Sequence, residues 1–442
     1  MAKPKTALIL GGGLAGLTCA YELARAGVAV TVLEKEATVG GLARNFQHDG
    51  GKFDLGGHRF FTDQPELLDW LRALLADDLL EVPRKSRIRL QGRYFDYPLR
   101  AANALSGFGL RETARILADF STAAMQRAMS GAEDLSLEDW VTHRFGKRLY
   151  EIYFQPYSQK TWGLPCDQIS AVWAAQRIQL LSLADAVRQA LAPTRRAPKT
   201  YADKFWYPTQ GIGVIGETLA AKIKELGGRV LTDTPVQRLV AHRDRIVEVV
   251  AACEACEAEM VISTIPLPVL GAWLDAPAAA LARLRYRAIR CLYLLLDRPR
   301  VTDDTWLYFP EAELPFGRSH EPRNWAPALA PPTGTSLVLE FFCNEGDALW
   351  LRDEDELAEN CAADLARLGL IERGEMRGHH GARVADAYPV FTVGFQQPLK
   401  AVTDHLASFA NLHLLGRTGA YRYDNMDQVI DAALVLAREV TR

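Results

Sequence analysis

The sequence predicts a mixed α/β protein of several domains, and three observations support this. The chain opens with a strand–helix–strand pattern over residues 6–36, and a second unit of this kind starts at residue 205. After residue 290 the apolar runs lengthen and read as strands of a mostly antiparallel sheet. Residues 62–200 read mostly as helices, so they predict a helical insertion. The 442 residues are too many for one hydrophobic core.

The opening stretch carries Gly11, Gly13 and Gly16 in a G-x-G-x-x-G pattern between an apolar run and a helical pattern. The first glycine allows a tight turn, the second lets a phosphate approach the backbone, and the third lets helix and strand pack closely. The helix N-terminus then offers unpaired N–H groups to a pyrophosphate. Glu34 follows Gly11 by 34 − 11 = 23 positions, close to the ~20 expected for a ribose-binding carboxylate. We therefore expect a Rossmann-type dinucleotide site rather than a glycine-rich turn without a ligand. The predicted site also includes Leu14, Ala15 and Lys35.

A second glycine pair follows this acid directly. Gly40 and Gly41, with Leu42 and Arg44 after them, suit a loop that returns over the same pyrophosphate. Arg44 is the predicted charge partner of the phosphates. A surface turn with a solvated arginine is the alternative.

A third glycine pair, Gly56-Gly57, precedes His58 among residues that look buried. This pattern suggests a backbone that passes close to a flat ligand, with His58 over it. A packed, hydrogen-bonded structural histidine is the alternative.

The helical insertion contains one expected hairpin, over residues 88–97, that turns at Gln91-Gly92. Residues 154–163 predict a loop with Tyr157 and Trp162, whose rings either wall a pocket or belong to the core. Helices are expected over residues 67–75, 100–129, 140–153 and 171–183, the last of which carries Arg177.

Beyond the insertion, the expected elements alternate again. The second α/β unit is expected to have a helix over residues 214–226, followed by a strand over 229–231 and a segment over 235–240. Residues 246–250 and 259–264 are expected to continue the sheet. Further strands are expected at 291–296, 305–309, 336–343 and 412–416, and helices at 354–368 and 426–439.

The composition excludes several classes of protein. A net charge of −3 gives no electrostatic basis for binding nucleic acid. No apolar run approaches the ~18 residues of a membrane span, and no signal peptide fits the first residues. The seven scattered cysteines favour a reduced, cytoplasmic location. Cys253-x-x-Cys256 lacks a second ligand pair, so we expect no metal.

Together these residues resemble the FAD-dependent amine-oxidase-like flavoproteins, the superfamily that includes protoporphyrinogen oxidases and carotenoid desaturases. Within it, residues 154–163, 388–389 and 416–426 most resemble UDP-galactopyranose mutase. The similarity covers most of the chain, although residues 62–150 and 290–384 match only in pattern.

The resemblance implies a non-covalently bound FAD, and the second glycine loop with the late Gly416-Arg417 pair favours FAD over NAD. In such proteins the late helix points its N-terminus at the flavin pyrimidine ring. Residues near Val236 contact the adenine through their backbone. The implied cofactor contacts also include Gly57, His58, Thr264, Asn425 and Met426.

The resemblance also divides the chain. Three segments, residues 1–62, 205–285 and 401–442, are expected to form the FAD-binding domain. Residues 63–204 are expected to form a mostly helical cap, and residues 286–400 an antiparallel-sheet substrate domain.

Two reactions remain open. In the first, a redox enzyme transfers a hydride from an organic substrate, such as a sugar or nucleotide sugar, to the flavin, and NAD(P)H or another electron donor or acceptor is a candidate partner. In the second, a non-redox mutase uses reduced flavin to change the ring size of a nucleotide sugar. We favour the redox reaction, because Asn425 stands where bacterial mutases usually have aspartate and residues 207–211 look like the oxidase side.

The mutase chemistry needs cations for the diphosphate of its substrate. Arg177 and Arg417 match arginines of the mutase pattern, and arginine meets phosphate oxygens bidentately. Structural ion pairs are the alternative role for these arginines. The other candidate catalytic residues are His58, Tyr157, Trp162, Tyr388, Tyr423 and Asn425.

Overall fold

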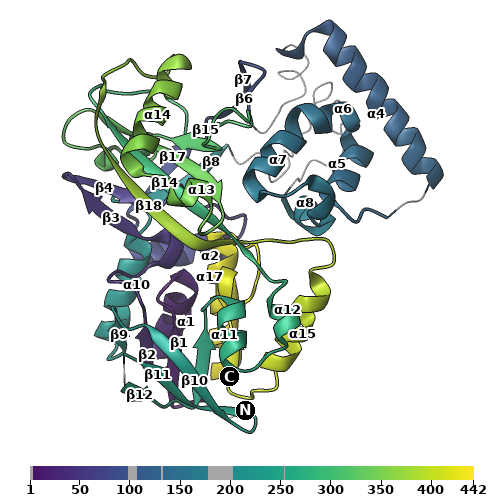
Figure 1. Cartoon of the computed structure of the whole chain (residues 1–442). Helices are drawn as coiled ribbons and strands as arrows, with labels where there is room; N and C mark the ends of the chain where they lie inside the picture. Colours follow the sequence, from purple (N-terminus) through teal and green to yellow (C-terminus); the bar gives the residue numbers. More distant parts are fainter. Residues whose placement is uncertain (1–2, 98–106, 131–132, 178–202, 253) are drawn as a thin grey trace.

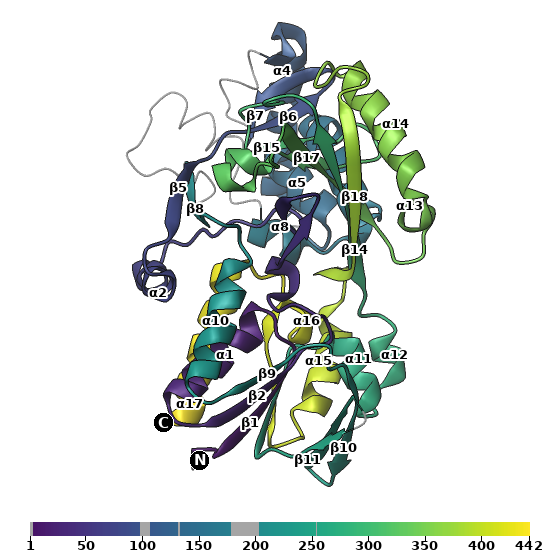
Figure 2. The same cartoon turned by 90° about the vertical axis from the view of Figure 1, so that its left-hand side faces the viewer.

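The computed structural model describes residues 3–97, 107–130, 133–177, 203–252 and 254–442. The chain has the predicted mixed α/β fold, with a parallel sheet in the lower half of Figure 1 and a second sheet above it. A group of helices lies beside the upper sheet. Figure 2 shows the same two levels from the side, with both termini in the lower half.

The lower half is built on a parallel sheet whose strands run in the order β19-β13-β1-β2-β9. Ile9 pairs with Ile262 on one side and with Val32 on the other, and all three are fully buried. The predicted strand–helix–strand opening is therefore confirmed. The strands are β1 (Thr6–Leu10), β2 (Ala29–Leu33), β9 (Arg229–Leu231), β13 (Met260–Ser263) and β19 (Leu412–Leu414).

Three helices from distant parts of the chain cover one face of this sheet: α1 (Leu14–Arg25), α10 (Val214–Glu225) and α17 (Met426–Thr441) (Figure 2). Their apolar stripes meet, and Leu17, Ile215 and Ile430 are fully buried in one cluster. The first, middle and last parts of the chain thus share a core, as the resemblance implies.

A three-stranded antiparallel sheet and further helices pack near the other face. The expectation that residues 246–250 continue the parallel sheet was wrong. They lie in β11, which pairs antiparallel with β10 across a short turn at Arg243, whereas a parallel neighbour would need a long crossover. The elements here are β10 (Val236–His242), β11 (Arg245–Ala251), β12 (Glu254–Cys256), α11 (Leu267–Trp273), α12 (Ala278–Leu281) and α15 (Gln396–Leu406).

The expected start of the second α/β unit also lies outside the parallel sheet. Residues 205–207 belong to β8 (Lys204–Pro208), which pairs antiparallel with β5 (Leu79–Pro83). The predicted helix α10 follows it and does pack on the parallel sheet.

The upper sheet has, within the described residues, the strand order β18-β14-β17-β16-β15-β6-β7. The predicted antiparallel sheet after residue 290 is confirmed. The predicted hairpin is also confirmed, and its strands β6 and β7 extend this sheet through a parallel pairing with β15. The strands are β6 (Ser86–Leu90), β7 (Arg93–Asp96), β14 (Tyr286–Leu296), β15 (Trp306–Tyr308), β16 (Arg318–His320), β17 (Thr335–Cys343) and β18 (Met376–Pro389).

Both faces of β17 are covered, so all nine of its residues are buried. Helix α14 (Glu354–Arg367) covers one face. The hairpin of β3 (Asn45–His48) and β4 (Gly51–Asp54) contributes Phe53 to the other. This hairpin follows directly after the second glycine loop, so it joins the two halves.

The helical group differs from the prediction in two places. Residues 154–163 were expected to form a loop, but they form α7 (Gln155–Trp162). Pro156 in its first turn and the left-handed Gly163 (φ 64°) after it are ordinary helix boundaries. The expected helix 140–153 is interrupted at Gly146, whose φ of 82° a helix cannot contain.

Of the remaining helices, α2 (Pro65–Leu75) packs against α10 of the lower half. Residues 178–183 of the expected helix 171–183 and residues 100–106 of the expected helix 100–129 lie outside the described residues. The other remaining helices are α4 (Leu110–Ser130), α5 (Leu137–Phe145), α6 (Lys147–Leu149), a π-helical turn (Tyr150–Phe154), α8 (Ala171–Arg177), α13 (Ala348–Leu351) and α16 (Gly416–Gly419), with 3₁₀ turns at Gly41–Ala43, Cys166–Gln168, Pro322–Asn324 and Pro327–Leu329.

In the described parts of the chain, no helix combines the length and the apolar character that crossing a bilayer requires. The expected domain boundary at residue 400 falls inside α15, which packs against α12 of the lower half.

Candidate functional site

The turn between β1 and α1 is shaped by its glycines. Gly11 has a φ of 107°, and its N–H donates to the Leu33 carbonyl at 2.8 Å. A Cβ at Gly16 would collide with the Gly11 carbonyl oxygen, so only glycine lets α1 start this close to β1. Helix α1 has neither a capping side chain nor an acid in its first turn. Its first N–H groups therefore point, uncapped, beyond the end of the sheet.

Glu34 at the end of β2 closes the other side of this turn. Its Oε2 accepts from the Gly12 N–H at 2.7 Å and its Oε1 from the Glu36 N–H at 2.9 Å. The side chain is 6 % exposed and also lines the pocket described below. Because a carboxylate has about four acceptor sites, Glu34 can also bind a ligand hydroxyl.

The second glycine loop lies directly on the first. The Gly40 N–H donates to the Gly12 carbonyl at 2.8 Å. Both Gly40 and Gly41 have positive φ, of 107° and 59°. Arg44 donates to the Gly41 carbonyl at 3.2 Å and lies 3.9 Å from Glu36, so its guanidinium stays at this loop.

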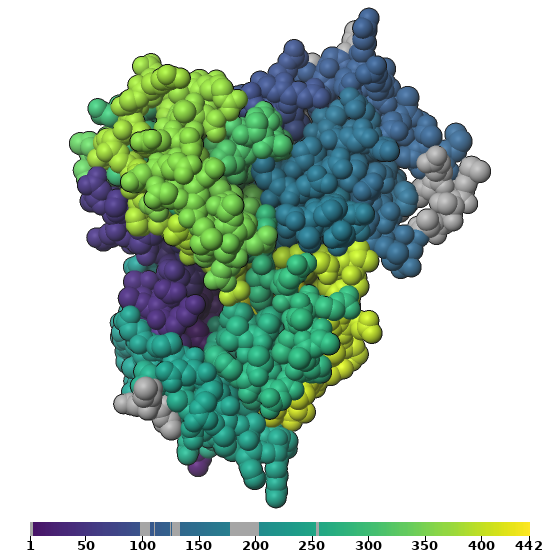
Figure 3. All heavy atoms as spheres, in the orientation of Figure 1, coloured from purple at the N-terminus to yellow at the C-terminus, as the bar shows by residue number. Residues whose placement is uncertain are grey.

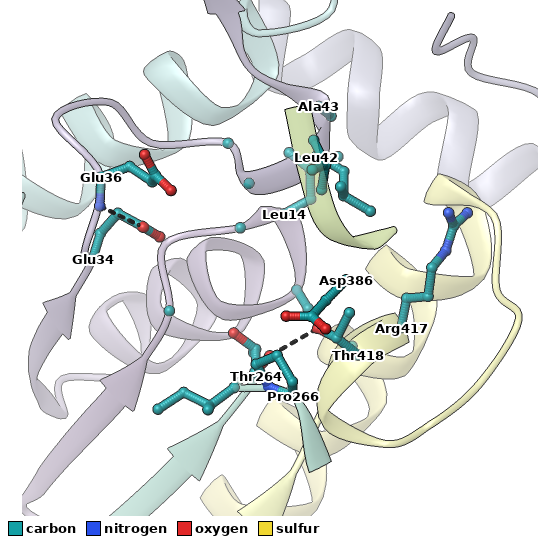
Figure 4. A pocket seen from close by; sticks show the side chains of 18 of the residues that line it. Leu14, Glu34, Glu36, Leu42, Ala43, Thr264, Pro266, Asp386, Arg417 and Thr418 are labelled. Atoms are coloured by element: carbon teal, nitrogen blue, oxygen red, sulfur yellow. Dashed lines mark hydrogen bonds between the residues drawn. The ribbon is translucent and has the colours of Figure 1, made fainter. Parts of the chain in front are cut away.

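These two loops border a pocket of about 600 Å³. In the space-filling view the molecule is hollowed where the purple N-terminal part meets the later segments (Figure 3). Figure 4 shows Glu34 and Glu36 at one end, Arg417 at the other and Asp386 between them. Every predicted cofactor-binding residue lines the pocket except Gly16 and Gly57. Gly16 instead serves the helix–strand contact.

His58 lines the pocket and is held by the loop before it. The Gly56 N–H donates to the Tyr293 hydroxyl at 3.0 Å, and the Gly57 N–H to Glu340 Oε1 at 3.2 Å. Burial and the nearby Arg417 lower the pKa of His58 to about 4. The imidazole is therefore neutral at pH 7.

Glu340 forms a buried ion pair with Arg318 that the sequence analysis did not identify. The Arg318 Nη2 lies 2.5 Å from Glu340 Oε2, and Glu340 is completely buried in β17. Burial alone would raise the pKa of Glu340, but Arg318 and His320 outweigh it and lower the pKa to about 2. The pair is thus ionised and internally compensated.

Aromatic residues surround this pair. The Arg318 guanidinium donates to the Tyr388 hydroxyl at 3.0 Å, and Tyr388 stacks on Tyr423 with ring centroids 5.7 Å apart. Tyr157 contacts Tyr308 edge-on at 5.7 Å. Burial raises the pKa of Tyr157 well above its ordinary value and also raises that of Tyr388, so both hydroxyls stay protonated at neutral pH.

Arg417 connects the pocket to these rings. Its guanidinium lies 5.4 Å from the Tyr388 ring centroid and 5.6 Å from that of Tyr423. Its Nε and Nη2 donate to the Asp424 carbonyl at 2.9 and 2.6 Å, which fixes the side chain on the loop before α17. Asn425, the N-cap of α17, also lines the pocket.

Trp162 is not among the residues that line the pocket. Trp162 is 3 % exposed and packs against Trp173 and Tyr423. Arg177 is the last residue of α8, and its side chain lies outside the described part of the chain. Cys253 also lies outside the described residues. The described residues contain no cluster of three or more His, Cys, Asp or Glu side chains that would hold a metal ion.

Four residues near the site were missed by the sequence analysis: Arg318, Glu340, Tyr308 and Asp386. They lie on β15, β16, β17 and β18, strands far from the glycine motifs in sequence. No local motif marks them. The available signal was Glu340 inside the apolar strand pattern of β17, because a buried charge needs a partner of opposite charge.

The pocket fits a dinucleotide. Two glycine loops leave backbone accessible, because a Cβ at Gly13 would meet only the Gly41 Cα within 4 Å. The uncapped α1 N-terminus suits a pyrophosphate, and Glu34 suits a ribose. The start of α17 supplies a second helix N-terminus at the other end.

Comparisons with known proteins agree with this geometry. Residues 14–441 match the family described as flavin containing amine oxidoreductase. The chain is 30 % identical over 213 residues to a coproporphyrinogen III oxidase of Mycobacterium tuberculosis, a match that spans 44 % of this chain and 47 % of the relative. The chain therefore matches only about half the length of that relative.

Two solved structures share the fold over the whole chain. One is a reduced UDP-galactopyranose mutase, with a TM-score of 0.84 and 22 % identity, covering 100 % of this chain and 94 % of that one. The other is a putative protoporphyrinogen oxidase from Exiguobacterium sp. 255-15, with a TM-score of 0.78 and 19 % identity, covering 100 % and 99 %.

Proposed function

Because the chain belongs to the flavin-containing amine oxidoreductase family, we propose that it oxidises a hydroxyl-bearing organic substrate, such as a sugar or nucleotide sugar. The cofactor is FAD. Bound FAD supplies the acceptor for a hydride from the substrate. The residues that would hold it are the two glycine loops with the α1 N-terminus, Glu34, and the start of α17.

The observation that carries this proposal is the polar group beside the pocket. Arg318 is compensated by Glu340 and His58 is neutral at pH 7, so of these three groups and Arg417 only Arg417 brings net charge to this end of the pocket. Tyr157 and Tyr388 keep their hydroxyl protons and can donate to substrate oxygens. Such a surface suits a polar, hydroxyl-rich substrate held by hydrogen bonds. An unprotonated His58 can accept a hydrogen bond from the hydroxyl whose carbon is oxidised.

A second candidate is a non-redox nucleotide-sugar mutase. Two guanidiniums meet at one tyrosine pair, since Arg318 donates to the Tyr388 hydroxyl and Arg417 lies over the same ring. Arginines so placed suit a diphosphate. This observation supports the Arg417 part of the hypothesis that Arg417 and Arg177 meet an anionic group.

One anaerobic experiment separates the two candidates. The purified flavoprotein is mixed with free sugars and with UDP- and TDP-sugars. An oxidoreductase should bleach its flavin absorbance with one of them and regain it when an acceptor is added. A mutase should leave oxidised flavin unchanged, but after chemical reduction it should interconvert pyranose and furanose forms without net flavin oxidation. The redox proposal fails if only the second result is seen.

His58→Ala tests the wall of the pocket directly. Because His58 lines the pocket, its removal should change the flavin absorbance envelope and lower turnover at least tenfold, while FAD stays bound. His242→Ala, at an exposed position in β10, is the matched control and should change neither. If the spectrum and rate of His58→Ala match the parent, His58 is only a packing residue.

A further inference from the structure

Asp386 presents a carboxylate to the pocket from the wall opposite the glycine loops. It lies on β18, a strand of the upper sheet, and lines the pocket with its neighbours Val384 and Ala385. Figure 4 shows its side chain reaching into the pocket from this strand. The glycine motifs give no indication of this residue, because it comes from a different sheet.

This carboxylate has no protein partner among the residues that the structure describes: no hydrogen bond or ion pair reaches it there. Burial raises the pKa of Asp386, with Lys35 opposing the rise and Glu345 adding to it. Glu34, the other carboxylate of the pocket, differs because it accepts two backbone N–H bonds. Glu34 therefore stabilises its own loop through these bonds, whereas Asp386 stabilises no loop in this way.

A half-buried carboxylate without a protein partner takes its hydrogen bonds from water, so a ligand that displaces this water must donate to the carboxylate in its place. The pocket is where a donor would lie. A diphosphate has no hydrogen to give and is repelled by a carboxylate, so the donor is another part of the dinucleotide.

The position along the strand indicates which part. Glu34 already occupies the end expected for the adenosine ribose. The next residue after Asp386, Ala387, accepts from Arg417 Nη1 at 3.4 Å, and Tyr388 follows in the aromatic group. In Figure 4 Asp386 lies between the Glu34 end and the Arg417 end of the pocket. The hydroxyl-bearing part of FAD between its adenosine half and its flavin ring is the ribityl chain.

We propose that Asp386 is a cofactor-binding residue that accepts hydrogen bonds from the ribityl hydroxyls of FAD. It complements Glu34, so that each half of the dinucleotide is held by one carboxylate.

The test measures the binding of FAD and ADP to flavin-free protein, without any turnover. ADP contains the adenosine half and the diphosphate but no ribityl chain. Asp386→Ala should weaken FAD binding about tenfold, the loss of one hydrogen bond to a charged group, and leave ADP binding unchanged. Asp386→Asn keeps an acceptor oxygen and should fall between the parent and Ala. Glu34→Ala, the matched control, should weaken both ligands.

FAD analogues that each lack one ribityl hydroxyl complete the test. At least one of these analogues should bind the parent more weakly than FAD does. The same analogue should bind Asp386→Ala as tightly as FAD does. Unchanged or tighter FAD binding by Asp386→Ala would overturn the proposal, as would an equal loss for ADP. If Asp386→Ala does not fold by circular dichroism, the same comparison with Asp386→Asn decides, since Asn keeps the shape of the side chain.

Discussion

Glu340→Leu is expected to lower the free energy of unfolding by about 3–5 kcal/mol, because it leaves the Arg318 guanidinium buried without a counter-ion. The parent carboxylate accepts from Arg318 Nε at 2.6 Å and from the Gly57 N–H at 3.2 Å. One substitution therefore removes the charge partner of Arg318 and the anchor of the His58 loop. Denaturant unfolding of the flavin-free protein measures the loss.

A double variant shows whether the unpaired charge is the cause. Glu340→Leu with Arg318→Met replaces both charges by apolar side chains and should regain most of the lost stability. If the double variant is as unstable as Glu340→Leu, the packing around β17 and not the ion pair is responsible.

The same residue gives the protein an acid-dependent stability. The pKa of Glu340 is about 2 in the folded protein against 4.5 for an ordinary glutamate. The Glu340 carboxyl group therefore binds a proton more tightly in the unfolded chain than in the folded protein. Its contribution to the free energy of unfolding is fully present above pH 4.5 and is lost as the pH falls toward 2. A shift of this size corresponds to about 3 kcal/mol. Between pH 4.5 and 2, the free energy of unfolding of Glu340→Leu should therefore fall less than that of the parent, because the variant lacks this carboxyl group.

Gly16→Ala should have the second large effect, on FAD binding as well as on stability. A Cβ at this position would collide with the Gly11 carbonyl and lie 2.9 Å from the Ile9 side chain. The Gly11 backbone cannot shift without a large cost in free energy. Helix α1 must therefore move away from β1, and its N-terminal N–H groups move with it. We expect a loss of about 1–3 kcal/mol in stability and at least a tenfold weaker FAD complex.

Gly378→Ala is the matched control for this substitution. This glycine lies in β18, has no positive φ, and its added Cβ would make an ordinary contact at 3.6 Å with Leu295. Its stability and FAD affinity should stay close to those of the parent. Gly16→Ala with parental FAD affinity would show that the close start of α1 does not matter for the cofactor.

Local signals explain most of what the sequence predicted correctly. The opening strand, turn, helix and strand were identified because glycine spacing and apolar periodicity are properties of neighbouring residues. The hairpin at Gln91-Gly92 was identified for the same reason, and both residues have positive φ. The error at residues 154–163 was also local: the aromatic content was given more weight than the helix boundaries Pro156 and Gly163.

The sequence by itself determined the α/β class, the dinucleotide turn with Gly11, Gly13 and Gly16, and FAD as the cofactor. These features depend on short-range geometry, because a position with a positive φ or a close backbone approach accepts few residue types. Only the tertiary structure decided that Asp386 stands across the pocket from that turn and that Arg318 pairs with Glu340 nearby. Arg318, Glu340 and Asp386 come from three strands whose pairing no local pattern specifies, because an antiparallel sheet brings together residues far apart in the chain. The meeting of buried charges there follows from strand register and burial, which the folded sheet alone fixes.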